Sequence, residues 1–216
     1  MGRRKHAFDE DIELNSKQSV IWKTEKGRDR LEDHYKRFLS KLGAGVGIRT
    51  VPTRIGSGQM LVMGPNDGTP ILCLHAMRTG APFLLSELIP LARTAKLYVP
   101  DLPGQSIHGI DVELPVNDDS FAKWVLDVMD FANLNRVGVF GVSWGGWVAQ
   151  SFASLYPDRV NRIATLVPAG IVKGNTAMDL LKMVPRMIRY QLSPSRENLK
   201  RLFDRLVTTL DDDWMG

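Results

Sequence analysis

Residues 137–150 read VGVFGVSWGGWVAQ, and this stretch decides the fold. An apolar run leads into a turn crowded with glycines around Ser143, and small and apolar residues then resume at helical spacing. A Gly-x-Ser-x-Gly pattern between a strand and a helix is typical of a sharp turn that strains its central residue. Glycine at Gly141 and Gly145 relieves crowding against the neighbouring strand and helix. We therefore predict that Ser143 presents its hydroxyl at a sheet edge; an ordinary glycine-rich turn that contains a serine is the alternative.

The segments around this turn alternate between strand and helix patterns. Apolar strand-like runs are found at 71–75, 96–101, 136–142 and 161–169, and helical patterns at 82–92, 118–134 and 145–156. Such alternation predicts an α/β fold with a mostly parallel, doubly wound sheet covered on both faces. Right-handed crossovers bring the strand ends to one edge, so we expect a site near His75, Asp101, Val142 and Ala169.

The rest of the chain suggests three parts. Residues 1–27 show no clear period and are interpreted as an N-terminal arm. The core, residues 28–174, begins with a helix at 28–42 and a hairpin whose strands, 48–55 and 59–64, are joined at 56–58. Residues 175–216 are expected to form a helical cap, with helices at 177–192 and 195–210. Pro185 is expected to kink or split the first, and Ser195 can cap the second.

Composition limits the compartment and the partners. The chain has 216 residues, 44% of them hydrophobic, and one cysteine, which predicts a sizeable core and a reducing compartment. The net charge of +4 arises within residues 1–50, which we interpret as a solvated tail, with contact to an anionic surface as the alternative. No apolar signal or spanning segment follows the basic start. We therefore expect a cytoplasmic protein without a membrane or nucleic-acid partner.

Cofactor and metal motifs are not found in the sequence. The glycines of GAGVG (residues 43–47) do not have the spacing of a dinucleotide-binding loop, and no strand precedes them. Paired His, Cys or carboxylate spacings typical of metal sites are also missing. We expect no cofactor, no metal and a small-molecule substrate.

Four segments together resemble the α/β-hydrolase-fold superfamily, in its serine carboxylesterase-like branch with a helical cap. They are LHAMRTGAPF (74–83), DLPGQSIHG (101–109), GVSWGG (141–146) and YPDRVNRIATLVPA (156–169). The resemblance covers about residues 30–210. It implies that Ser143 is a nucleophile, that the amides of Met77 and Trp144 form an oxyanion hole, and that His75 has a structural role. Ala76 stands where the family has glycine, which implies strain if that position is left-handed.

The resemblance also implies partners for Ser143 that this sequence does not supply. The family places an acid and then a histidine after the serine. The histidines here are His6, His34, His75 and His108, all of which precede Ser143; His75 or His108 as the base would break the family order. We therefore expect that the C-terminal part of the fold is lacking. The chain by itself is then expected to expose the edge of its last strand. Three explanations stay open: a fragment of a longer protein, a second chain that completes the sheet, and an inactive truncation.

The resemblance implies a serine hydrolase that cleaves a small carboxylic ester or related carbonyl compound through an acyl-enzyme on Ser143. Apolar residues near Met77 and Trp144 and on the 177–192 helix suit an acyl or small aromatic group, although core packing explains them equally well. The alternative function is a catalytically incomplete hydrolase-fold protein that binds a small molecule or a partner.

Overall fold

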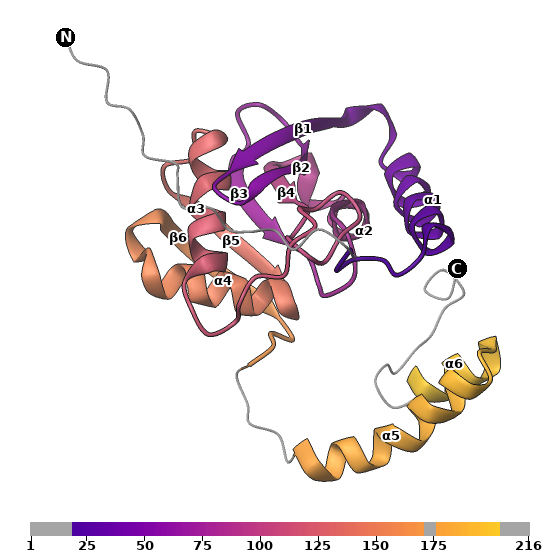
Figure 1. The fold of residues 1–216 in the computed structure, drawn as a ribbon. Coiled ribbons are helices and arrows are strands. Elements are labelled where there is room, and N and C mark those ends of the chain that lie inside the picture. The colour runs from indigo at the N-terminus through magenta and orange to yellow at the C-terminus, as the bar shows by residue number, and fades with distance from the viewer. Residues whose placement is uncertain (1–18, 171–175, 204–216) are drawn as a thin grey trace.

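A six-stranded sheet forms the centre of the computed structural model, which describes residues 19–170 and 176–203 (Figure 1). Its strands are β1 Val46–Thr53, β2 Gly56–Met63, β3 Thr69–Leu74, β4 Ala95–Pro100, β5 Val137–Val142 and β6 Val160–Leu166. They lie in the order β1-β2-β4-β3-β5-β6. Strands β3 to β6 are parallel, whereas β2 pairs antiparallel with both β1 and β4. The predicted α/β fold with a mostly parallel sheet is therefore confirmed.

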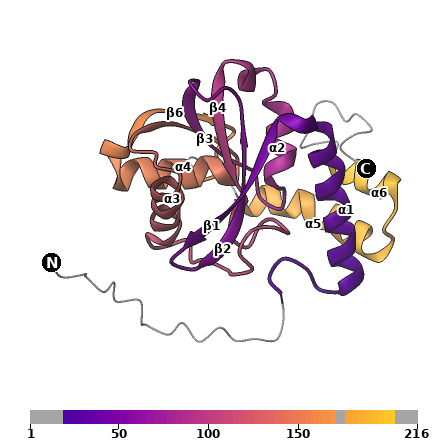
Figure 2. The same cartoon turned by 90° about the horizontal axis from the view of Figure 1, so that it is seen from above.

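Helices cover both faces of this sheet (Figure 2). The main helices are α1 Glu25–Lys41, α2 Ala81–Glu87, α3 Ser120–Phe131, α4 Trp144–Leu155, α5 Thr176–Leu192 and α6 Arg196–Phe203. Single 3₁₀ turns are formed by Gly43–Gly45, Leu91–Arg93 and Pro157–Arg159. Helix α2 packs on one face, with α1 against it, and α3 and α4 pack on the other face.

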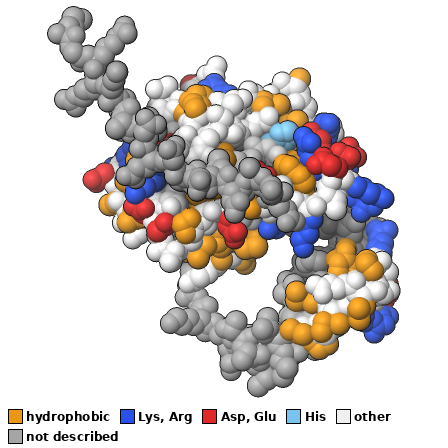
Figure 3. Space-filling view, viewed as in Figure 1, with side chains coloured by type: hydrophobic (Ala, Val, Ile, Leu, Met, Phe, Trp, Pro, Cys, Tyr) orange, Lys and Arg blue, Asp and Glu red, His pale blue; other side chains and the backbone are white. Residues whose placement is uncertain are grey.

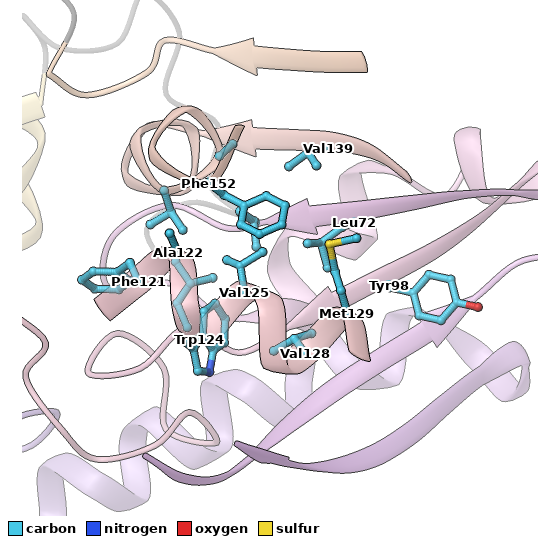
Figure 4. Packing of buried hydrophobic residues seen from close by; sticks show 14 of the residues in the cluster. Leu72, Tyr98, Phe121, Ala122, Trp124, Val125, Val128, Met129, Val139 and Phe152 are labelled. Carbon is cyan, nitrogen blue, oxygen red and sulfur yellow. The ribbon is translucent and has the colours of Figure 1, made fainter. Parts of the chain in front are cut away.

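Strand side chains alternate between two buried clusters. On β4, Leu97 and Val99 pack in the cluster beneath α2, while Tyr98 between them packs in the cluster beneath α3 and α4. Figure 4 shows the second cluster, in which Met129 of α3 lies close to Leu72 of β3 and Phe121 lies at the other end of the cluster. This period of two is why continuous apolar runs predicted strands that are buried on both faces.

Two predicted boundaries differ from the structure. The hairpin turns at Arg54 and Ile55, not at 56–58, because Thr53 pairs directly with Gly56, where β2 begins. Arg54 is fixed there by Asp127 of α3, which accepts hydrogen bonds from its backbone N–H and its guanidinium group. The predicted 82–92 helix ends at Glu87, since Pro90 disfavours a helical conformation in the residue before it.

Helix α5 runs continuously through Pro185, so the expected split does not occur. Ser195 caps α6 as predicted, because its Oγ accepts the N–H of Asn198 at 3.2 Å. Apolar side chains of α5 are exposed, and Figure 3 shows such side chains over α5 and α6 and charged ones over α1.

Residues 1–18 of the predicted arm, the boundary at residue 174 and residues 204–216 lie outside the described residues. Among the described helices, none has the length and apolar character needed to cross a bilayer.

Candidate active site

Ser143 lies at the sharp turn between β5 and α4. Its backbone angles are φ 49° and ψ −110°, a positive φ that only a few non-glycine residues of the described chain adopt. Its Oγ has no hydrogen-bond partner among the described residues and is not sealed from solvent. The hydroxyl is therefore presented by a strained backbone, which costs about 1–3 kcal/mol and is typical of functional sites.

The glycines around Ser143 are required by close packing. A Cβ added at Gly141 would lie 2.3 Å from the carbonyl oxygen of Gly145. A Cβ at Gly145 would lie 2.1 Å from the carbonyl oxygen of Leu74, the last residue of β3. These distances are far below van der Waals contact with backbone atoms, which cannot swing aside. The glycines thus let the turn sit directly against the end of β3.

His75 and Asp101 follow the ends of β3 and β4, and both are fully buried. The Nε2 of His75 accepts the N–H of Leu102 at 2.9 Å, so the ring proton lies on Nδ1, which donates to the carbonyl of Ala76 at 2.8 Å. Burial lowers the pKa of His75, and the nearby carboxylate of Asp101 only partly opposes this effect. His75 is therefore a neutral residue that ties two loops together, and neither ring nitrogen is free to act as a base.

Asp101 is held by three donors. Its Oδ1 accepts the N–H of Ala81 at 2.8 Å and the hydroxyl of Ser106 at 2.6 Å, and its Oδ2 accepts the hydroxyl of Tyr35 at 2.7 Å. Burial and the Asp101 carboxylate raise the pKa of Tyr35 far above its usual range, so Tyr35 stays a donor. For Tyr35, the sequence predicted only that it lies in the 28–42 helix.

The remaining described histidines are His34, which lies on α1, and His108, which contacts α1. His108 Nε2 lies 3.1 Å from a carboxylate oxygen of Glu32, and its ring packs on Tyr35 at 4.3 Å between centroids. His34 Nδ1 lies 3.1 Å from the guanidinium of Arg37. Neither histidine contacts Ser143, so the structure gives no support to His108 as the base; His6 lies outside the described residues.

Met77 and Trp144 line the same cavity, which has a volume of about 330 Å³. Their backbone N–H groups donate to no acceptor within the described part of the chain. The N–H of Trp144 shares a planar peptide with the carbonyl of Ser143. That carbonyl accepts hydrogen bonds from Trp147 at 3.1 Å and Ala169 at 3.0 Å, which fixes the direction of the Trp144 N–H. The two residues that were predicted to supply the oxyanion donors thus line one cavity, and their N–H groups are unpaired within the described residues.

Aromatic rings form one side of this region. The indole rings of Trp144 and Trp147 stack at 4.8 Å between centroids, and the ring of Phe121 meets both edge to face. The Nε1 of Trp144 is buried without a hydrogen-bond partner in the described residues. Such a group is costly to leave unpaired, so an acceptor at this point would be favoured.

The loop after β3 differs from the expectation for Ala76. The positive φ in this loop belongs to Arg78, at 55°, and Ala76 is not left-handed, so alanine imposes no strain there. Arg78 is also a residue that sequence reasoning missed. Its Nη1 donates to the carbonyl oxygens of Val20 and Ile21, and its N–H donates to Gln105 Oε1. No local sequence pattern predicts these contacts, because they join segments that are far apart in the sequence.

The outer edge of β6 is unpaired within the described residues, as we expected for the last strand. Most of its side chains are exposed, including the apolar Ile163 and Leu166, and Val167 directly after it is 73% exposed. The β6 edge, Val160–Leu166, is thus an open strand beside the turn that holds Ser143.

Comparisons with known proteins agree with this fold. One curated relative is an uncharacterized carboxylesterase, nap, of Bacillus subtilis. It is 26% identical to this chain, and the match covers 55% of this chain and 40% of the relative. A second is a haloalkane dehalogenase of Psychrobacter cryohalolentis, which is 30% identical over 50% of this chain and 37% of the relative. The chain spans about 40% of the length of these relatives. Naproxen esterase from Bacillus subtilis has a similar solved structure, with a TM-score of 0.68, 20% identity and coverage of 88% of this chain and 65% of that one.

A family model described as "alpha/beta hydrolase fold" matches residues 69–210, which is more than half of the chain. The carboxylesterase relatives agree with a hydrolase in general terms. Together with the sheet order and the turn at Ser143, this match places the chain in the alpha/beta hydrolase fold family.

Proposed function

We propose that this chain is the nucleophile-bearing part of a serine hydrolase that cleaves a small carboxylic ester. The observation that carries the proposal is the strained, accessible Ser143, which directly precedes Trp144; Trp144 and Met77 line one cavity, and their backbone N–H groups are unpaired within the described residues. The names of the carboxylesterase relatives support the same class of substrate. The apolar surfaces of Met77 and the stacked Trp144 and Trp147 favour an acyl or small aromatic group.

In this proposal, Ser143 Oγ attacks the ester carbonyl carbon and gives its proton to a general base. The carbonyl oxygen becomes an oxyanion that accepts the N–H groups of Met77 and Trp144, a stabilisation that is worth about 10²–10³ in rate for each donor. The alcohol leaves with a proton, and water then releases the carboxylic acid from Ser143.

The general base and its acid are proposed to come from polypeptide outside the described residues. Two observations support this: the nitrogens of His75 are both engaged, and His108 is paired with Glu32. The unpaired β6 edge offers a place for such polypeptide, either a further segment of the same protein or a second chain, to add to the sheet.

A reducing, cytoplasmic setting is also proposed. It is supported by the single cysteine, Cys73, which is buried. Burial raises the pKa of the Cys73 thiol to about 12.

The test is covalent labelling of the full-length protein with a fluorophosphonate probe, read by mass spectrometry of its peptides. We expect one label on Ser143, lost in Ser143→Ala and retained in Ser86→Ala, a control serine whose Oγ donates to the carbonyl of Phe83. Hydrolysis of p-nitrophenyl butyrate should fall by about 10³-fold or more in Ser143→Ala. A label on another residue would refute the proposal.

A second function is favoured by one observation: no described histidine contacts Ser143. If no histidine reaches Ser143 in the whole protein, the chain is a hydrolase-fold module that binds a small molecule or a partner and catalyses no reaction. A correctly folded full-length protein that neither labels at Ser143 nor hydrolyses the ester would establish this alternative over the hydrolase.

A further inference from the structure

A second cavity, of about 70 Å³, lies on the α1 side of the loop after β3. Residues of α1, of the 78–83 segment and of two neighbouring loops line it. Its walls are largely apolar, with Leu31, Phe38, Pro82 and Phe83 among them. Largely apolar pockets of this kind accept small hydrocarbon groups. The space is small, which favours a short aliphatic chain over a ring system.

The charge on the residues that line this cavity is positive. The lining residues include no carboxylate, and Arg78 is the one that carries a permanent charge. His34 also lines the cavity, but burial, helped by the charges of Arg37 and Lys41, lowers its pKa and keeps it neutral near pH 7. An anionic group is therefore favoured beside Arg78, and a cationic group is not.

Arg78 lies at the junction of this cavity and the larger one, because it lines both. Its Nη1 is held by the carbonyl oxygens of Val20, at 2.9 Å, and Ile21, at 3.5 Å. In the part of the chain that the structure describes, no carboxylate pairs with it, whereas Arg54 and Arg159 each bind an aspartate. A guanidinium that is held by neutral acceptors keeps donors free in a fixed orientation, which suits a carboxylate.

We propose that this cavity binds a small aliphatic monocarboxylate, with its carboxylate on Arg78 and its chain between Phe38, Pro82 and Phe83. The site is separate from the Ser143 turn and does not depend on reaction at Ser143. A short-chain acid bound there would sit next to the larger cavity, with Arg78 between the two.

The probes are hexanoate and 1-hexanol, titrated calorimetrically into the full-length protein. Hexanoate should bind at least about tenfold more tightly than hexanol, because a charge-assisted pair adds to the same apolar burial. Arg78→Gln should weaken hexanoate by about tenfold or more and leave hexanol unchanged. Arg93→Gln, which removes an arginine from the distant Leu91–Arg93 turn, should change neither. No hexanoate binding at millimolar concentrations, or equal affinity in Arg78→Gln, would overturn the proposal.

Tryptophan variants of the two cavities locate the bound chain. Leu31→Trp fills the smaller cavity from its rim and should abolish hexanoate binding. Val116→Trp narrows only the larger cavity and should leave hexanoate binding intact. Ile107→Trp fills the smaller cavity from another wall and replaces Leu31→Trp if that variant does not fold. Binding that is lost in Val116→Trp and kept in Leu31→Trp would place the acid in the larger cavity and refute this site.

Discussion

The N–H of Ser143 donates a 2.9 Å hydrogen bond to the carbonyl oxygen of Leu166, the last residue of β6. The carbonyl of Ser143 in turn accepts the N–H of Ala169 at 3.0 Å. The peptide groups on both sides of the Ser143 Cα are thus fixed by the segment that ends β6. These hydrogen bonds offset the strain at Ser143 and make β6 a structural support of the candidate site as well as an open edge.

Because Ser143 has a positive φ, glycine should fit this position better than alanine. We expect Ser143→Gly to exceed Ser143→Ala in free energy of unfolding by about 1 kcal/mol, since both remove the hydroxyl but only glycine relieves the backbone. Urea denaturation of the two variants measures the difference. Equal stabilities would mean that the turn carries no strain at this residue.

Gly145 should not tolerate a methyl group. Its added Cβ would lie 2.1 Å from the carbonyl oxygen of Leu74, so Gly145→Ala must displace α4 or β3 and should cost about 3 kcal/mol of unfolding free energy. Gly138→Ala, in the neighbouring strand β5, is the control. Its Cβ would meet only Ile71 Cγ1, at 3.8 Å, so its effect should stay within about 1 kcal/mol. Similar costs at the two positions would contradict the close approach.

The sequence predicted those parts of the site that depend on local spacing. The pattern around Ser143 lies within six residues, so the glycines, the strand before them and the helix after them could all be placed. The pairing of His108 with Glu32 could not, because it joins a loop to α1 across the fold. The same holds for the contacts of Arg78 with Val20 and for the antiparallel pairing of β2 with β4, which depend on how distant segments pack.

His75 should make stability depend on pH. Burial lowers its folded-state pKa below the unfolded value of 6.5, so the unfolded chain binds the proton first as the pH falls. The contribution is fully present above about pH 6.5 and is lost as the pH falls toward the folded pKa, with a slope of up to about 1.4 kcal/mol per pH unit. The imidazole shifts of His75, followed by NMR, should stay those of the neutral ring through pH 6.5. A midpoint at 6.5 would contradict this expectation.

His34 supplies the control for that measurement. Its pKa is also lowered by burial, but it lies at the surface of α1 and makes fewer buried contacts than His75. His34→Gln should therefore leave most of the loss of stability between roughly pH 7 and 5 in place. If this variant removes most of the pH dependence, His34 and not His75 is its source.

The Arg54–Asp127 pair should stabilise the fold by joining the β1–β2 turn to α3. Asp127 accepts hydrogen bonds from the backbone N–H, Nε and Nη2 of Arg54 at 2.9, 2.8 and 2.7 Å. This bidentate geometry makes a strong ion pair although the pair is partly exposed. Asp127→Asn should cost about 1 kcal/mol of unfolding free energy, and 1 M salt should reduce the difference. Asp119→Asn removes a single contact with Lys123 on the surface of α3 and should cost about 0.5 kcal/mol or less. If Asp127→Asn is no more costly than Asp119→Asn in urea denaturation, the hairpin turn does not depend on α3 for its position.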